Sequence, residues 1–177
     1  MKIHAKCKYD QKAVRAMTHL WMFKEASPKK RMRIWTITYA LLLLILVLQI
    51  MLIGPDTLLV VLTGVLLAVY ALECYMYFWM PRRRYKAMGK LKDVENSYTF
   101  EKSAFTVVTK SAGQTGKDTV QYTNLVRAYE TGKYFFFWRD KNQLYMVDKT
   151  TVSTDEVQSI RSLVRQHIPN NYVICKY

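Results

Sequence analysis

Two long apolar segments dominate the pattern of hydrophobic and polar positions along the chain. Residues 34–53 contain no charged side chain, and residues 58–80 contain a single acid, Glu73. Roughly 20 apolar residues, rising about 1.5 Å each along a helix, cover a hydrocarbon core about 30 Å thick. Each segment is therefore long enough to cross a membrane, and the pattern predicts a transmembrane helical hairpin over residues 34–80.

The connection between the two segments is the short sequence Gly54-Pro55-Asp56-Thr57. It is typical of a tight turn and is too short to cross a bilayer, so the two predicted helices are antiparallel neighbours. The turn carries no Lys or Arg, whereas both outer flanks are rich in them. The positive-inside bias therefore predicts a multi-pass protein of the cytoplasmic membrane with both termini in the cytoplasm.

The formal net charge of +14 suits either nucleic acid or a membrane surface, so its distribution decides between them. Residues 1–33 carry +8 and residues 81–96 carry +4, which places most of the charge beside the apolar segments. This distribution favours anionic lipid head groups over nucleic acid as the partner. The basic residues expected at the membrane surface are Lys29, Lys30, Arg31, Arg33, Arg82, Arg83, Arg84 and Lys86.

Residues 1–33 form a predicted cytoplasmic arm. Apolar and polar side chains alternate over residues 3–7, which indicates a short half-buried strand. Asp10 stands at the N-cap position of a following amphipathic helix, which Ser27-Pro28 ends. This basic helix either lies in the membrane interface, with residues 21–23 as anchors, or packs on a soluble domain, and the sequence leaves both interpretations open.

After the hairpin, Pro81 is expected to end the second span and to begin a basic linker over residues 81–96. From Ser97 onward the apolar period changes to two, and residues 111–116 read as a polar loop. The pattern predicts five or six strands with hairpin-length connections, and therefore a meandering antiparallel sheet. The stretches concerned are residues 98–100, 105–109, 119–122, 125–130, 134–138 and 144–147.

A helix is expected at the end of the chain. Ser153 and Glu156 form a capping box, and apolar residues recur behind it at helical spacing, namely Val157, Ile160, Leu163, Val164 and Ile168. A curved sheet buries one face, and an amphipathic helix that follows it supplies the cover. Residues 97–177 are therefore predicted to form an α+β cytoplasmic domain.

The order of these elements resembles the YcxB-like family of bacterial membrane proteins. The resemblance rests on Tyr98-Thr99-Phe100-Glu101, the aromatic hairpin from Val126 to Trp138, Leu144-Tyr145-Met146-Val147 and the helix after Ser153. Such proteins look like membrane-anchored relatives of pleckstrin-homology (PH) domains. The resemblance implies a PH-like fold, in which a C-terminal helix caps a curved antiparallel sheet of seven strands. The strand at residues 3–7 would then complete that sheet.

Polar and small residues inside the predicted spans are candidates for function. Glu73 lies about 11 Å from the cytoplasmic end of its span, at the depth of Thr38 and Tyr39, whose hydroxyl groups are suited to bond it. It is either a functional carboxyl or a hydrogen-bonded contact between helices. Small residues about one turn apart permit close approach to the first helix or to another copy of the chain, and these are Gly64, Ala68 and Ala71.

No motif for catalysis, a cofactor or a metal ion is visible. Cys7, Cys74 and Cys175 lack metal-ligand spacing and are expected to be thiols, and the three histidines fall in separate elements. Basic residues at predicted hairpin ends, such as Lys133, are usually only solvated, although PH-type folds can bind lipid head groups there.

The leading hypothesis is a non-enzymatic, membrane-anchored interaction or sensing module that presents a PH-like domain at the cytoplasmic membrane surface to a protein partner. The alternative is a transport or channel component built from several copies of the chain, with Glu73 in the membrane interior.

Overall fold

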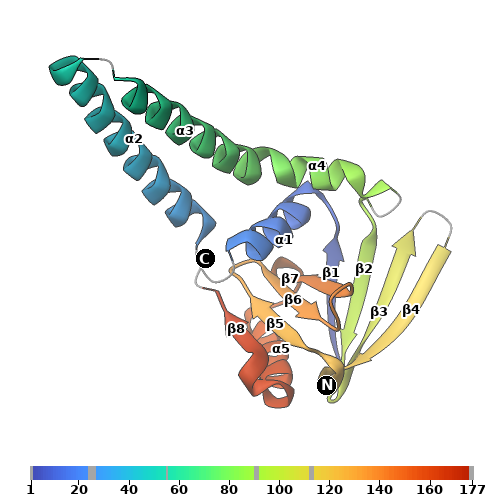
Figure 1. The fold of residues 1–177 in the computed structure, drawn as a ribbon. Coiled ribbons are helices and arrows are strands. Elements are labelled where there is room, and N and C mark those ends of the chain that lie inside the picture. The colour runs from blue at the N-terminus through green and yellow to red at the C-terminus, as the bar shows by residue number, and fades with distance from the viewer. Residues whose placement is uncertain (1, 24–26, 55, 90–91, 112–113, 176–177) are drawn as a thin grey trace.

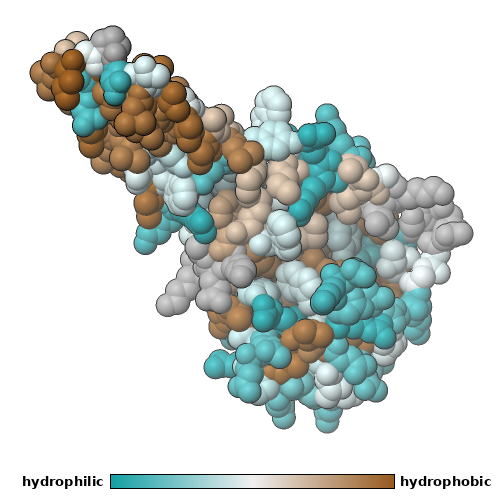
Figure 2. Space-filling view, viewed as in Figure 1, coloured by the Kyte–Doolittle hydropathy of each residue, from teal (hydrophilic) through white to brown (hydrophobic). Residues whose placement is uncertain are grey.

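The structure is a computed structural model that describes residues 2–23, 27–54, 56–89, 92–111 and 114–175. Figure 1 shows two long helices that project from a domain containing two sheets and a C-terminal helix. Apolar side chains cover most of the projecting helices, whereas polar side chains cover much of the domain surface visible in Figure 2. The chain thus separates into an apolar hairpin and a polar-surfaced domain.

The hairpin consists of α2 (Pro28–Ile53) and α3 (Thr57–Cys74). After α3 the helix continues through a π-helical segment, η1 (Tyr75–Trp79), into α4 (Met80–Ala87). By length and composition, α2 and the continuous helix of residues 57–87 could each span a membrane. The apolar stretches of both helices are not buried inside the molecule, whereas the apolar stretch of a core helix would be.

The expected helix end at Pro81 is wrong, because Pro81 lies in the first turn of α4 and the helix runs on to Ala87. Pro81 has no N–H group to donate to the Tyr77 carbonyl one turn earlier, and that oxygen lies instead 3.2 Å from Nε2 of His19. The π-helical segment directly before it changes the hydrogen-bond register of the helix. The first part of the predicted basic linker is therefore helical.

The connection at the other end of the hairpin is the predicted tight turn. Gly54 ends α2 with a positive φ of 99°, and its N–H group donates to the carbonyl oxygen of Ile50. Asp56 occupies the N-cap position of α3. Pro55 lies outside the described residues. The antiparallel arrangement of α2 and α3 follows from this turn (Figure 1).

The two helices face each other along a seam of partly covered residues that recur every three or four positions. Such spacing keeps one side of each helix toward the other. The residues are Met32, Trp35, Tyr39, Leu43, Leu46 and Ile50 on α2, and Leu59, Thr63, Leu66, Tyr70, Glu73 and Cys74 on α3. Across the seam, the Tyr39 and Tyr70 rings lie 5.1 Å apart.

The domain contains two sheets of four strands each. The strand order of the first sheet is β1-β2-β3-β4, and all its pairs are antiparallel: β1 (Ile3–Lys8), β2 (Glu95–Phe100), β3 (Ala104–Ser111) and β4 (Gln114–Gln121). The order of the second is β7-β6-β5-β8, and only its β5–β8 pair is parallel: β5 (Arg127–Glu130), β6 (Tyr134–Trp138), β7 (Leu144–Asp148) and β8 (Tyr172–Ile174).

The predicted arm strand is confirmed, and it belongs to the sheet of the C-terminal domain. β1 pairs with β2 from Ile3 opposite Phe100 to Lys8 opposite Glu95. Its side chains alternate between buried and exposed, as the period of two predicts. Because β1 and β2 are neighbours in space, the whole stretch between them, including the hairpin, is inserted between two paired strands of one sheet.

Two expectations for the sheet need correction. The predicted polar loop over residues 111–116 is mostly strand, because β3 and β4 remain paired out to Ser111 opposite Gln114, with residues 112–113 outside the description. Backbone hydrogen bonds hold the distal end of this ribbon, where the sequence has no apolar alternation that could reveal a strand. The short strand β8 was not expected, and it joins the second sheet through β5.

The core lies between the two sheets and is closed by the terminal helix, α5 (Thr154–His167). Its largest buried side chains are aromatic and include Phe100, Phe105 and Phe137. Each such side chain contributes roughly 1.5–3 kcal/mol through burial. The expected capping box of Ser153 and Glu156 begins α5, and the helix adds Ile160 and Val164 to the core.

The amphipathic arm helix, α1 (Gln11–Phe23), packs on the domain. Asp10 caps it by accepting a 2.8 Å hydrogen bond from the N–H group of Ala13. Ala13 and Leu20 join the same core cluster as the strands. Tyr134 and Phe136 of β6 are buried as well. Of the two interpretations of the arm helix, packing on the domain is observed.

Candidate functional site

The candidate site lies at the base of the hairpin, where the end of α1, the start of α2 and the end of α3 meet. A cavity of about 360 Å³ opens there, lined by residues that include Trp21, Arg31, Trp35, Glu73 and Met76. Figure 1 shows why it forms: α2 and α3 diverge from the turn toward the domain, and α1 lies near their far ends.

Glu73 is half-buried and lines this cavity together with Arg31 of α2. The Arg31 guanidinium carbon lies 5.6 Å from the centroids of both the Phe23 and the Trp35 rings, which hold it by cation–π contact. Among the described residues, no ion pair within 4 Å joins Arg31 to Glu73. Glu73 therefore faces the other helices across a cavity with a cation on its opposite wall.

The hydroxyl groups expected to bond Glu73 are used differently. Within the described part of the chain, neither Thr38 nor Tyr39 hydrogen-bonds Glu73; Thr38 is exposed and Tyr39 packs on Tyr70. The polar contact across the seam is instead a 3.3 Å hydrogen bond between the hydroxyl groups of Thr36 and Tyr70. Tyr39 lies opposite Tyr70, whereas Glu73 shares its cavity with Arg31, Met32 and Trp35, so the expected bond from Thr38 or Tyr39 to Glu73 is wrong.

The small residues of α3 do not pack against α2. Gly64, Ala68 and Ala71 are all exposed, and the space beside Gly64 is open. They fall between the seam positions, on a part of the helix that the chain itself leaves uncovered. The expectation that they bring α3 close to α2 is therefore wrong, and contact with another copy of the chain stays a prediction.

The basic residues expected at the membrane surface gather around the base of the hairpin from two separate helices. Arg84 of α4 lies with its guanidinium carbon 4.8 Å from the Trp21 ring, and Arg83 donates a 2.6 Å hydrogen bond to the Tyr75 hydroxyl. The other six are exposed, namely Lys29, Lys30, Arg31 and Arg33 of α2, and Arg82 and Lys86 of α4. The fold thus combines the two basic flanks into one charged region.

A histidine joins α1 to the π-helical segment, in a contact that no sequence pattern indicated. The His19 ring stacks on Tyr77 at 4.6 Å, and its Nε2 atom lies 3.2 Å from the backbone oxygen of Tyr77. Burial lowers the pKa of His19, the nearby Arg15 lowers it further, and the contact with the Tyr77 carbonyl opposes both. π-Helical turns often mark functional positions in helices, and here the turn meets the arm.

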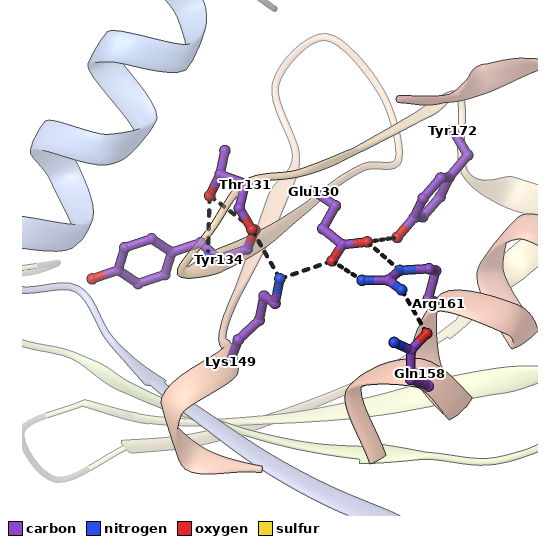
Figure 3. Close-up of polar contacts among 7 residues, drawn as sticks. All are labelled: Glu130, Thr131, Tyr134, Lys149, Gln158, Arg161 and Tyr172. Carbon is purple, nitrogen blue, oxygen red and sulfur yellow. Dashed lines mark hydrogen bonds and ion pairs between the residues drawn. The ribbon is translucent and has the colours of Figure 1, made fainter. Parts of the chain in front are cut away.

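A second unexpected feature is a buried ionic network centred on Glu130 (Figure 3). Glu130 is 1% exposed, yet it accepts four hydrogen bonds. Arg161 of α5 donates two of them, at 2.7 and 2.6 Å, Lys149 donates one at 2.8 Å, and the Tyr172 hydroxyl of β8 donates one at 2.6 Å. The network ties β5 to α5 and β8.

Burial alone would raise the pKa of Glu130, but the hydrogen bonds from Arg161, Lys149 and Tyr172 hold that pKa at about 2. The carboxylate is therefore ionised at neutral pH and saturated with donors. Such a group cannot accept a proton from a substrate, and it has no free oxygen lone pair pointing to solvent. Its role is to stabilise the fold, and it is not a catalytic candidate.

No other chemistry is evident in the described residues. No group of three His, Cys, Asp or Glu residues among them is placed to hold a metal ion. Cys7 and Cys74 are thiols, and Cys7 and Cys175 are buried. No family model, curated protein or solved structure matches the chain. The resemblance to the YcxB-like family therefore stays a prediction.

Proposed function

We propose that the protein is a non-enzymatic interaction or sensing module that presents its sheet domain at the cytoplasmic surface of a membrane. The observation that carries this proposal is the insertion of the hairpin between β1 and β2, two strands that pair along their whole length. An anchor attached at both ends to one sheet differs from a tail on a flexible linker. An anchor attached at both ends would hold the domain in one position relative to the hairpin.

The two connections between hairpin and sheet support this argument, because they are tied to each other. The Tyr9 N–H group donates to the Val94 carbonyl at 2.9 Å, and the Asp93 N–H group donates to the Tyr9 carbonyl at 3.2 Å. The Tyr85 hydroxyl of α4 donates to Asp93 at 2.8 Å. A tilt of the helices would therefore be transmitted to β1 and β2, as a membrane-sensing domain requires.

The order of the elements supports a PH-like fold for this domain. Four antiparallel strands, β1 to β4, are followed by three more, β5 to β7, and then by α5. This is the order expected of a seven-stranded PH-like sheet with a C-terminal helix, once the arm strand is counted. β8 and the inserted hairpin would be additions to it.

The experiment that tests the interaction role places a photo-crosslinking residue at Val126 in the full chain in native membranes. Val126 is 59% exposed and borders a groove with Trp21 and Lys141, next to the base of the hairpin. We expect one discrete crosslinked protein at this position. The matched control is Lys117, an exposed residue of β4. Equal crosslinking at both positions, or none at Val126, would contradict the interaction role.

The alternative is an oligomeric transport or channel component, and the observation that favours it is the Glu73 cavity beside an uncovered face of small residues. Two helices cannot enclose a pathway alone, so this function requires several copies. Light scattering of the protein in neutral detergent decides, because a monomer would exclude the alternative.

A further inference from the structure

A larger cavity, of about 590 Å³, lies between α1, the first turn of α2 and the turn that joins β5 to β6. We name it the basic cavity after the residues Lys12, Arg15, His19, Lys29 and Lys133 that line it. No Asp or Glu is part of its described lining, and Ser27 and Thr131 add hydroxyl groups. The cavity therefore offers donors and positive charge to whatever occupies it.

The cations of the basic cavity form no ion pair within 4 Å in the described part of the chain. Lys12, Arg15, Lys29 and Lys133 take part in none of the ion pairs there. The lysines of β1 and the lysine just before it behave differently, since Lys2, Lys6 and Lys8 each meet an acid at 3.2 to 3.5 Å. Like charges around one concave surface repel one another unless an anion is present.

The walls of the basic cavity are held in place before any ligand binds. Arg15 and His19 both contact the Tyr77 ring, at 5.6 and 4.6 Å from its centroid. On the other wall, the Thr131 hydroxyl accepts from the Tyr134 N–H group at 3.1 Å, and the Lys133 carbonyl accepts from the Lys149 N–H group at 2.8 Å. A preorganised site loses little entropy on binding.

The position of the cavity along α2 indicates the source of the anion. The apolar stretch of α2 begins at Ile34, and Lys29 precedes it by about 7.5 Å along the helix axis. Lipid head groups occupy a layer roughly 5–8 Å thick on each side of the hydrocarbon core. Lys29 therefore falls at head-group depth if the hairpin spans the membrane.

We infer that the basic cavity binds the phosphate group of an anionic phospholipid of the cytoplasmic leaflet. This inference rests on the proposed membrane placement and gives the sensing role a ligand. The four cations and the N-terminal end of α2 all favour a phosphate oxyanion. The site is distinct from the Glu73 cavity, which has an acid in its wall.

The test uses the purified full chain in a neutral detergent and measures the binding of three probes by native mass spectrometry and calorimetry. The probes are dioctanoyl phosphatidic acid, dioctanoyl phosphatidylcholine and inorganic phosphate. We expect the phosphatidic acid to bind most tightly. The double variant Arg15→Gln/Lys133→Gln should weaken that binding by about tenfold or more, since each basic residue near an anionic surface contributes severalfold.

The control variant Lys110→Gln/Lys117→Gln removes the same charge from the β3–β4 ribbon, outside the cavity. It should change the affinity by less than about twofold. An equal loss in this control would overturn the proposal, because it would show that diffuse charge attracts the lipid.

The other outcomes are also decisive. If phosphatidylcholine binds as tightly as phosphatidic acid, the cavity does not recognise negative charge. If inorganic phosphate binds as tightly as phosphatidic acid, the ligand is a free phosphate and not a lipid. The unfolding temperature of each variant shows whether it is folded. If Arg15→Gln/Lys133→Gln does not fold, Lys12→Gln/Lys29→Gln takes its place in the test. Because lipid binding is measured in detergent, it can be absent while the membrane topology and the crosslinking result are as proposed. Conversely, the lipid can bind although the topology or the crosslinking result is not as proposed.

Discussion

Glu130 is charged although its side chain is buried, and its partners explain why. Glu130→Gln keeps the shape of the side chain but leaves Arg161 and Lys149 without their counter-charge. Breaking a buried ion pair from one side costs roughly 3–5 kcal/mol, so the free energy of unfolding should fall by about that amount. Chemical denaturation of the domain in detergent measures it.

The matched control is Asp118→Asn, which weakens the exposed pair of Asp118 and Arg139 at 3.3 Å. Exposed pairs contribute less than about 1 kcal/mol. Equal destabilisation by the two substitutions would contradict the assignment of Glu130 as the main electrostatic contact of the domain.

The same network makes stability depend on pH in a defined direction. The pKa of Glu130 is about 2 in the folded chain, against an ordinary value of 4.5. The stabilisation is therefore complete above about pH 4.5, and it is lost as the pH falls toward 2. The free energy of unfolding, measured between pH 6 and pH 2, should fall more steeply for the native chain than for Glu130→Gln. Parallel curves would contradict the low pKa.

Glu73 gives the second prediction at the scale of the residue. It faces a cavity with Arg31 on the other wall and not an uncovered side of α3. Glu73→Gln should retain the assembly and stability of the hairpin, because an amide fits the same polar surroundings, whereas Glu73→Leu should disturb them. Size-exclusion profiles and unfolding temperatures in detergent make the comparison. If the two variants behave alike, Glu73 does not act as a polar contact between the helices.

At the scale of the element, β1 provides the sharpest test. Ile3 is 1% exposed and belongs to the core of a sheet that otherwise begins more than 90 residues later. Ile3→Ala should lower the free energy of unfolding by about 2–5 kcal/mol, since it removes buried methyl groups and leaves a cavity. Lys6→Ala on the exposed side of the same strand should change it by less than about 0.5 kcal/mol. Similar effects from both would show that β1 does not hold the domain together.

The elements themselves were largely predictable from sequence, because apolar periods of two and 3.6 follow directly from strand and helix geometry. The alternation in β1 and the capping box at Ser153 both predicted what is observed. The helix after Pro81 was not predicted, because a proline at a helix end and a proline in the first turn of a helix look the same in sequence. Only the distal end of the β3–β4 ribbon, read as a polar loop over residues 111–116, was missed, because polar strand ends held by backbone hydrogen bonds alone have no apolar period.

The candidate site was less predictable than the elements. Arg161 lies 31 residues after Glu130, and Tyr77 lies 58 residues after His19, so no local pattern links either pair. Both contacts depend on how elements pack. Lys29 and Lys133 were recognised individually, but their meeting with Lys12 and Arg15 around one cavity follows from the position of α1 beside the turn between β5 and β6.

At the scale of the whole molecule, the insertion of the hairpin between β1 and β2 limits the proposed membrane placement, because both ends of a spanning hairpin would have to return to one side. β1 and α1 precede the hairpin, β2 to β8 and α5 follow it, and all of them belong to one folded unit. A single crossing by either helix would separate β1 from β2. The fold and the distribution of basic residues therefore favour the same topology for independent reasons.

Labelling of introduced cysteines tests this topology in intact cells. Lys30→Cys and Asp118→Cys should resist an impermeant thiol reagent, because the positive-inside bias places them in the cytoplasm. Asp56→Cys, in the turn of the hairpin, should react. The native Cys7 gives little background, since burial raises its pKa to about 12 and keeps the unreactive thiol form. Permeabilised cells supply the control, in which Lys30→Cys and Asp118→Cys should both react. Labelling of either one in intact cells would overturn the cytoplasmic placement of the domain, and with it the proposed function.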